Sequence, residues 1–130
     1  MILTIRTDNP EAEIGLHQPD GTAIAHYTWH AHRELADTLL GKIRDLLETQ
    51  QQTFESITGL VVFQGPGSFT GLRIGITVAN AFAYGRDIPI VGSQGEAWVG
   101  EGLAKLAKGE NTKIVLPEYG AEAHITLPKK

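Results

Sequence analysis

The chain of 130 residues has no cysteine and a single methionine, and no apolar run in it comes near the length of a membrane span. Without cysteine the protein can form no disulfide, no thiolate metal site and no cysteine nucleophile, which fits a reducing compartment. A transmembrane helix needs about 20 consecutive apolar residues. The first ten residues, MILTIRTDNP, turn polar too soon for a signal peptide. We therefore expect a cytoplasmic protein that does not enter a membrane.

Basic residues are also in the minority. Lysine and arginine total 11 against 15 aspartate and glutamate residues, which gives a formal net charge of −4. Bulk electrostatics therefore do not favour a nucleic-acid backbone, and we expect any RNA contact to be local or made through a partner. The length and the hydrophobic content of 42% are those of one globular domain with a real core.

The pattern of apolar residues predicts the order of the helices and strands. Alternation predicts strands at 2–6, 12–16 and 22–30, joined by the turn clusters TDNP and PDG. An amphipathic helix is predicted over 34–50, because its apolar residues share an arc of about 140°. Short apolar runs at 60–63 and 88–92 predict buried strands, each followed by a helix, the last over 95–108. This β-β-β-α-β-α-β-α order predicts an α/β fold with a mixed sheet, of the ribonuclease-H-like or actin-like ATPase (ASKHA) type.

The segment QGPGSFTGLRIGITVANAFAYG, residues 64–85, has the most informative pattern. A glycine-rich turn between a strand and a helix suits an anion, since helix N-termini present free N–H groups. The turn lacks the lysine of a Walker loop, the third glycine of a dinucleotide fingerprint and the flanking glycines of a nucleophile elbow. Two interpretations stay open: a helix start capped by a hydroxyl side chain, or a weak anion site. The possible anion-binding residues are Gly65, Gly67, Ser68, Thr70 and Arg73.

The helix that follows this turn has only a narrow polar stripe, formed by Arg73, Thr77, Asn80 and Tyr84. Its apolar arc of about 220° is wider than a helix needs to cover one face of a sheet. Within the arc the small residues Gly71, Gly75 and Ala79 recur at every fourth position, where another helix backbone could approach closely. We expect a second chain to bury part of this arc, the alternative being that the chain's own helix and sheet bury it. The predicted partner interface is Gly71, Leu72, Gly75, Ile76, Ala79 and Ala83 on this helix, with Leu39 and Ile43 on the preceding one.

The residues GPGSFTGLRIG, 65–75, resemble the TsaB (YeaZ) family, which belongs to the bacterial machinery that makes threonylcarbamoyladenosine in tRNA. HREL at 32–35 and IPIVG at 88–92 are also similar to this family, so that the resemblance covers about residues 1–105. It implies an actin-like lobe, expected at 1–110, followed by a tail at 111–130. The second lobe that the family usually carries is expected to be absent.

The resemblance further implies a non-catalytic role. The family supports its relative TsaD by forming a heterodimer through the helices of this lobe; a TsaE-type ATPase is a further expected partner, and tRNA is reached only through the complex. The family usually begins Ile-Asp-Thr-Ser, whereas this chain has Ile5-Arg6-Thr7-Asp8. Arginine thus replaces a carboxylate that helps catalytic actin-like ATPases hold the metal–nucleotide, and a guanidinium cannot ligate magnesium. Asp8, on the same side of the strand, is the alternative carboxylate. We expect no catalytic residue, no cofactor and weak or absent nucleotide binding.

Rival interpretations are a nucleotide-binding or ATP-hydrolysing lobe, a protease, and a self-associating homodimer with no TsaD role. An unpartnered apolar patch favours self-association of the chain when it is alone. His26, His30 and His32 would share a strand face, but no acidic or sulfur ligand is obviously paired with them, so no metal site is expected. Both tryptophans are predicted to pack rather than stack on bases, and the lysines near 105–113 are predicted to be solvated.

Overall fold

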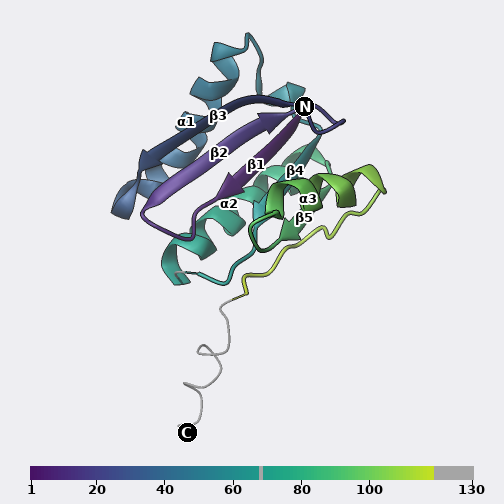
Figure 1. Ribbon diagram of the computed structural model, residues 1–130. Helices are drawn as coiled ribbons and strands as arrows, with labels where there is room; N and C mark the ends of the chain where they lie inside the picture. Colours follow the sequence, from purple (N-terminus) through teal and green to yellow (C-terminus); the bar gives the residue numbers. More distant parts are fainter. Residues whose placement is uncertain (68, 119–130) are drawn as a thin grey trace, which may run out of the picture.

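A computed structural model describes residues 1–67 and 69–118. A five-stranded mixed sheet forms its centre, with the strand order β3-β2-β1-β4-β5 (Figure 1). Strands β1 (Ile2–Arg6), β2 (Glu11–His17) and β3 (Ala23–His30) form an antiparallel meander. Strands β4 (Gly59–Phe63) and β5 (Ile90–Ser93) run parallel to β1. The predicted element order and the mixed sheet are confirmed.

Helices cover both faces of the sheet. Helices α1 (Leu35–Thr49) and α2 (Phe69–Arg86) lie together behind the sheet in the view of Figure 1, and α3 (Trp98–Ala107) lies in front of β4 and β5. Because β4 and β5 are covered on both sides, every residue in these two strands is buried. Two short 3-10 helices, His32–Glu34 and Phe54–Ser56, were not predicted from the sequence pattern. Among the described residues, no helix combines the length and the apolar character needed to cross a membrane.

Residues 111–118, which we call the strap, return beside β5 after α3 (Figure 1). The N–H of Thr112 donates to the carbonyl of Ile90 at 2.8 Å, and the Asn111 side-chain oxygen accepts from the N–H of Ile90 at 3.2 Å. Val115 is only 1% exposed. The lobe predicted to end at residue 110 therefore continues to 118, because the first part of the predicted tail supplies hydrogen bonds and core contacts. Residues 119–130 lie outside the described residues.

Much of the wide apolar arc of α2 is buried within the chain itself, whereas Ile74, Val78 and Phe82 are half-buried. The helix contacts β1, β4 and β5 on one side and α1 on another. Asn80, from the predicted polar stripe, donates to the carbonyl of Val115 and accepts from its N–H, both at 2.9 Å. The sheet, helix α1 and the strap thus each cover part of the surface of α2. This explains why its apolar arc is wider than that of a helix packed on a sheet alone.

Candidate functional site

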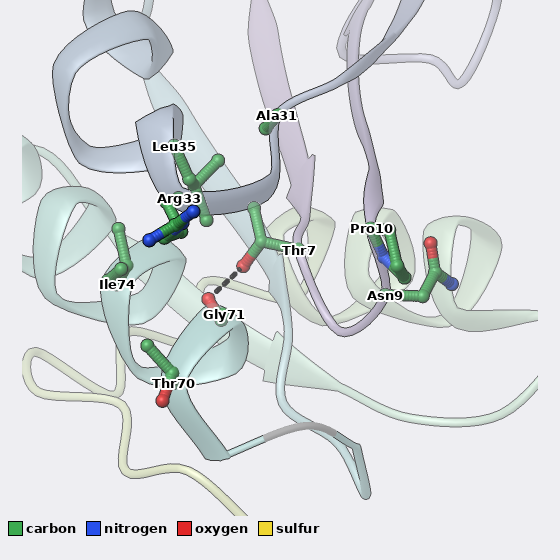
Figure 2. Close-up of a pocket in the computed structure, with 9 residues that line it drawn as sticks. All are labelled: Thr7, Asn9, Pro10, Ala31, Arg33, Leu35, Thr70, Gly71 and Ile74. Carbon is green, nitrogen blue, oxygen red and sulfur yellow. Dashed lines mark hydrogen bonds between the residues drawn. The ribbon is translucent and has the colours of Figure 1, made fainter.

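The carboxyl ends of β1 and β4 meet the N-terminus of α2 at one end of the sheet, and a cleft of about 460 Å³ opens beside them (Figure 2). Ligands of open α/β sheets commonly bind outside the carboxyl ends of parallel strands. The polar lining comes from Thr7 and Asn9 after β1, Arg33 before α1, and Thr70 in the first turn of α2. Arg33 is exposed and is the one charged residue among the described residues of the lining.

Arg6 and Asp8 form an ion pair at this end of the sheet. Arg6 Nε donates to Asp8 Oδ1 at 2.7 Å, and Nη2 donates to Oδ2 at 3.2 Å. The guanidinium carbon of Arg6 also lies 3.9 Å from the centre of the Phe63 ring. The hydrogen bond with Asp8 raises the pKa of Arg6 above its ordinary value. Each carboxylate oxygen of Asp8 thus accepts one hydrogen bond from Arg6, and a cation bound there would lie beside the positive guanidinium.

The glycine-rich turn is packed against protein atoms. A Cβ on Gly67 would collide with the side chain of Asp8, and one on Gly65 would collide with the carbonyl oxygen of Glu118. Gly65 also has a φ of +119°, which side-chain-bearing residues rarely adopt. These two glycines let the β1–β2 turn and the strap approach closely. Of the other predicted anion-binding residues, Thr70 lines the cleft, Arg73 is exposed on α2, and Ser68 lies outside the described residues. Anion binding stays a prediction.

Of the row of small residues on α2, Gly71 and Gly75 lie against Thr7, which directly follows β1. A Cβ on Gly75 would collide with the hydroxyl of Thr7, and that hydroxyl donates to the carbonyl of Gly71 at 2.7 Å, a bond drawn in Figure 2. The other residues of the predicted interface are 2% exposed or less: Leu72, Ile76, Ala79, Ala83, Leu39 and Ile43. Their prediction as a surface for a second chain is wrong, because the sheet and the packing of α1 on α2 already fill that space. A partner of α2 must contact its outward residues.

The outward surface of α1 and α2 is mixed in character. Leu40 on α1 is 47% exposed, although it was predicted in the buried arc. Arg44 and Asp45 on α1 and Thr77 on α2 are exposed polar residues. This surface offers both apolar and hydrogen-bonding contacts to another protein, as interfaces of ordinary composition do.

The histidines of the meander do not gather as predicted. His26 Nε2 lies 3.1 Å from Glu13 Oε2. His32 begins a 3-10 helix instead of extending β3, so it does not share a strand face with His30; its side chain is outside the described part of the chain. No group of three or more His, Cys, Asp or Glu residues in the described ranges could hold a metal ion.

His17 was not singled out from the sequence, although folding perturbs it. Burial, with a smaller effect from His26, lowers the pKa of His17. Its Nδ1 is buried and has no hydrogen-bond partner in the described structure. Only the cross-strand register of β2 and β3, which pairs Gly15 with His26, could have indicated that these imidazoles are neighbours.

The tryptophans pack as predicted, and one lysine does not behave as predicted. Trp98 is 4% exposed, with its ring centre 5.7 Å from that of Phe63. Trp29 donates from Nε1 to Thr38 Oγ1 at 3.2 Å. Lys105, predicted to be solvated, donates to the carbonyl of Gly92 at 2.8 Å and is partly buried.

Comparison with known proteins gives a consistent result. Residues 8–99 match the family model described as "TsaD: tRNA N6-adenosine threonylcarbamoyltransferase". The tRNA threonylcarbamoyladenosine biosynthesis protein TsaB of Escherichia coli (strain K12) is 37% identical over 91 residues, which cover 70% of this chain and 38% of the relative. TsaB of Bacillus subtilis (strain 168) is 36% identical over 68% of this chain and 38% of its own length.

A solved structure agrees with these sequence matches. YeaZ from Pseudomonas aeruginosa superposes with a TM-score of 0.63 at 26% sequence identity, over 72% of this chain and 42% of that one. The chain thus spans about two-fifths of the length of the curated TsaB relatives it matches, 38% in both cases. The described fold, an ASKHA-type mixed sheet, is the one that the sequence predicted. The chain therefore belongs to the TsaD family, and its similarity within that family includes the TsaB (YeaZ) proteins.

Proposed function

We propose that this chain is a non-catalytic subunit that binds a TsaD-type protein in the cytoplasm and supports the formation of threonylcarbamoyladenosine in tRNA. Relatives in two bacteria are named as biosynthesis proteins for this modification. The observation that carries the non-catalytic part is the Arg6–Asp8 ion pair, with its contacts at 2.7 and 3.2 Å. This pair occupies the place where a catalytic relative would need a free carboxylate.

The energetics of that ion pair argue against a metal–nucleotide site. A two-point arginine–carboxylate contact is among the stronger hydrogen-bonded pairs in proteins. Stacking of the guanidinium on Phe63 at 3.9 Å adds a cation–π attraction. A magnesium ion at Asp8 would compete with both contacts and would be repelled by the positive guanidinium beside it. We therefore infer that the chain works without a nucleotide cofactor of its own.

The TsaD-type partner is proposed to bind the outward surface of α1 and α2 that includes Leu40, Arg44 and Thr77. These residues lie on the exposed side of the two helices, opposite the side chains buried in the core. The net charge of −4 gives tRNA little attraction to this chain. Contact with tRNA is therefore proposed to occur only through the complex, in which a TsaE-type ATPase would be a further member.

Co-purification of the full chain with a TsaD-type protein, followed by an assay of modified tRNA, tests this proposal. Thr77→Arg places a bulky charge on the proposed surface and should reduce both co-purification and tRNA modification. Glu101→Arg is the matched control, because Glu101 is exposed on α3, at the other face of the sheet. It should leave both readouts unchanged. A chain that never co-purifies with the TsaD-type protein, or equal effects of the two variants, would refute the proposed partner surface.

The cleft beside α2 supports one alternative, a nucleotide-binding lobe. Its volume of about 460 Å³ suits a small ligand, and Arg33 could contact a phosphate. Calorimetric titration with magnesium-ATP separates the two functions. Submicromolar binding that Arg33→Ala abolishes would favour the alternative, whereas no measurable heat would favour the scaffold.

A further inference from the structure

Strand β3 is the outermost strand of the meander, and no described strand pairs with its free edge (Figure 1). The N–H of Ala31, directly after β3, donates to the carbonyl of Pro10 at 3.0 Å. Hydrogen-bonded positions alternate along an antiparallel pair, so every second residue back from Ala31 directs its backbone groups to β2. The N–H and C=O groups of His26 and Thr28, which lie between those positions, therefore point to the open side.

This edge lacks the features that usually protect an outer strand. Proteins protect such edges with proline, lysine, a short strand or a bulge. Strand β3 has eight residues, contains neither proline nor lysine, and has its irregular register only at its start, opposite Leu16 and His17. In the described ranges, no hydrogen bond reaches the outward backbone groups of His26 or Thr28. The edge can therefore accept an additional strand.

A small pocket lies beside this edge, on the face of the sheet that α1 covers. Its volume is about 170 Å³, and its lining includes Tyr27 of β3 with Leu46 and Thr49 of α1. Tyr27 is 41% exposed, and its ring stacks on that of Trp29 with 5.9 Å between the ring centres. Side chains alternate along a strand, so a strand added beside β3 would place every second side chain on the face with the pocket. The pocket has room for one aliphatic side chain.

Lys42 gives this pocket a positive charge. Its Nζ lies 5.4 Å from the centre of the Tyr27 ring. Lys42 forms no ion pair with any carboxylate in the described part of the chain. The neighbouring Asp45 pairs with Arg44 instead, at 3.4 Å. A carboxylate is therefore the group on an incoming chain that complements the pocket.

We propose that the free edge of β3 binds an extended peptide segment of another protein, which adds a strand to the sheet. The main chain of the segment bonds to the outward backbone groups of His26 and Thr28. An aliphatic side chain enters the pocket beside Tyr27, and an acidic side chain two positions away pairs with Lys42. Peptides that add to a sheet edge gain affinity from main-chain hydrogen bonds and specificity from pockets for alternate side chains.

A second copy of the chain fits this edge less well. Antiparallel pairing of two β3 strands through His26 and Thr28 places Tyr27 opposite the same residue of the copy. Two Lys42 side chains, each beside its Tyr27 ring, would then lie near each other and repel. The peptide site is also separate from the proposed TsaD-type contact on the outward surface of α1 and α2, so either proposal can fail without the other.

Fluorescence polarisation of a labelled octapeptide with the full chain tests the proposal. The peptide has threonine at every second position, with valine, glutamate, leucine and valine between them, and a second peptide with the reversed order allows either strand direction. At least one of the two should bind. Thr28→Pro removes an outward N–H, which an edge strand tolerates, and should weaken binding roughly tenfold or more. Thr28→Val keeps the N–H and is the matched control, which should bind as the parent does.

A charge exchange tests the contact with Lys42. Lys42→Glu should weaken binding of the glutamate peptide roughly threefold or more. A peptide with lysine in place of glutamate should recover most of this loss when it is tested with Lys42→Glu. If Lys42→Glu binds the glutamate peptide as well as the parent does, the proposed acidic contact is wrong.

Thermal unfolding shows whether Thr28→Pro keeps its fold. A peptide methylated on its backbone nitrogens, which can donate no main-chain hydrogen bond, gives the same test on the parent chain and should bind roughly tenfold more weakly or worse. The proposal is overturned if neither octapeptide binds, or if the methylated peptide binds as well as the unmodified one. Sedimentation that shows self-association abolished by Thr28→Pro, without peptide binding, would assign the edge to a second copy and also overturn it.

Discussion

Replacing Gly75 with alanine tests the contact between α2 and β1. The new Cβ would collide with Thr7 Oγ1 and would lie 2.9 Å from its Cγ2 and 3.0 Å from its Cβ. The same hydroxyl holds the carbonyl of Gly71 at 2.7 Å, so that any movement of Thr7 also disturbs this hydrogen bond. The collision involves the β-branched, buried side chain of Thr7 directly after β1, which has little room to turn away.

Three terms set the size of the effect. Overpacking in a tight core costs about 1–3 kcal/mol. Losing a hydrogen bond costs about 1 kcal/mol, and alanine returns about 1 kcal/mol of helix propensity. We therefore expect Gly75→Ala to lower the free energy of unfolding by about 1–3 kcal/mol, which for a chain of this size lowers Tm by roughly 4–10 °C. Urea and thermal unfolding of the purified variant measure both quantities.

Gly85→Ala is the matched control on the same helix. No atom lies within 4 Å of its added Cβ, so it should keep or slightly raise the stability. Thr7→Ala combined with Gly75→Ala should recover part of the loss, because it removes the colliding hydroxyl and methyl groups. If Gly75→Ala unfolds at the same temperature as Gly85→Ala, α2 does not pack on the end of β1 as described. The row of small residues on α2 would then be better explained as a surface for a partner.

Other perturbations have equally definite outcomes. Since burial and a neighbouring histidine lower the pKa of His17, its neutral form is favoured by folding. Its contribution to stability is therefore present above its unfolded pKa of about 6.5 and is lost as the pH falls below that value. Between pH 7.5 and pH 5 the urea midpoint should therefore fall less in His17→Asn than in the parent protein. Asn80→Ala removes both hydrogen bonds to the strap and should cost about 1–3 kcal/mol, whereas Thr77→Ala one turn earlier should change stability by less than about 0.5 kcal/mol. Equal urea midpoints for these two variants would contradict the anchoring of the strap. Arg6→Gln should cost about 1 kcal/mol, because its pair with Asp8 is only partly exposed; an unchanged urea midpoint would mean that the pair contributes nothing.

The local pattern of the sequence was sufficient to predict the helices and strands and to indicate the family. Alternation with period two predicted β1, β2 and β3, and the helical period predicted α1, because each element buries one regular face. The run at 65–75 indicated the family that the comparisons identify. The replacement of the first-strand carboxylate by Arg6 was also visible in the sequence, and with it the argument against a metal–nucleotide site.

Only the tertiary structure decided which surface buries each face. The periodic pattern of α2 indicated a wide buried arc and a row of small residues, but a hydrophobic pattern is the same whether the covering atoms belong to a partner helix or to Thr7, directly after the chain's first strand. The strap could not be predicted for the same reason, since Asn80 holds it through single backbone groups that leave no period in the sequence. The bidentate contact between Arg6 and Asp8 likewise depends on how the turn after β1 folds back. Periodicity is a property of neighbours along the chain, whereas burial by a distant segment depends on where the sheet brings that segment.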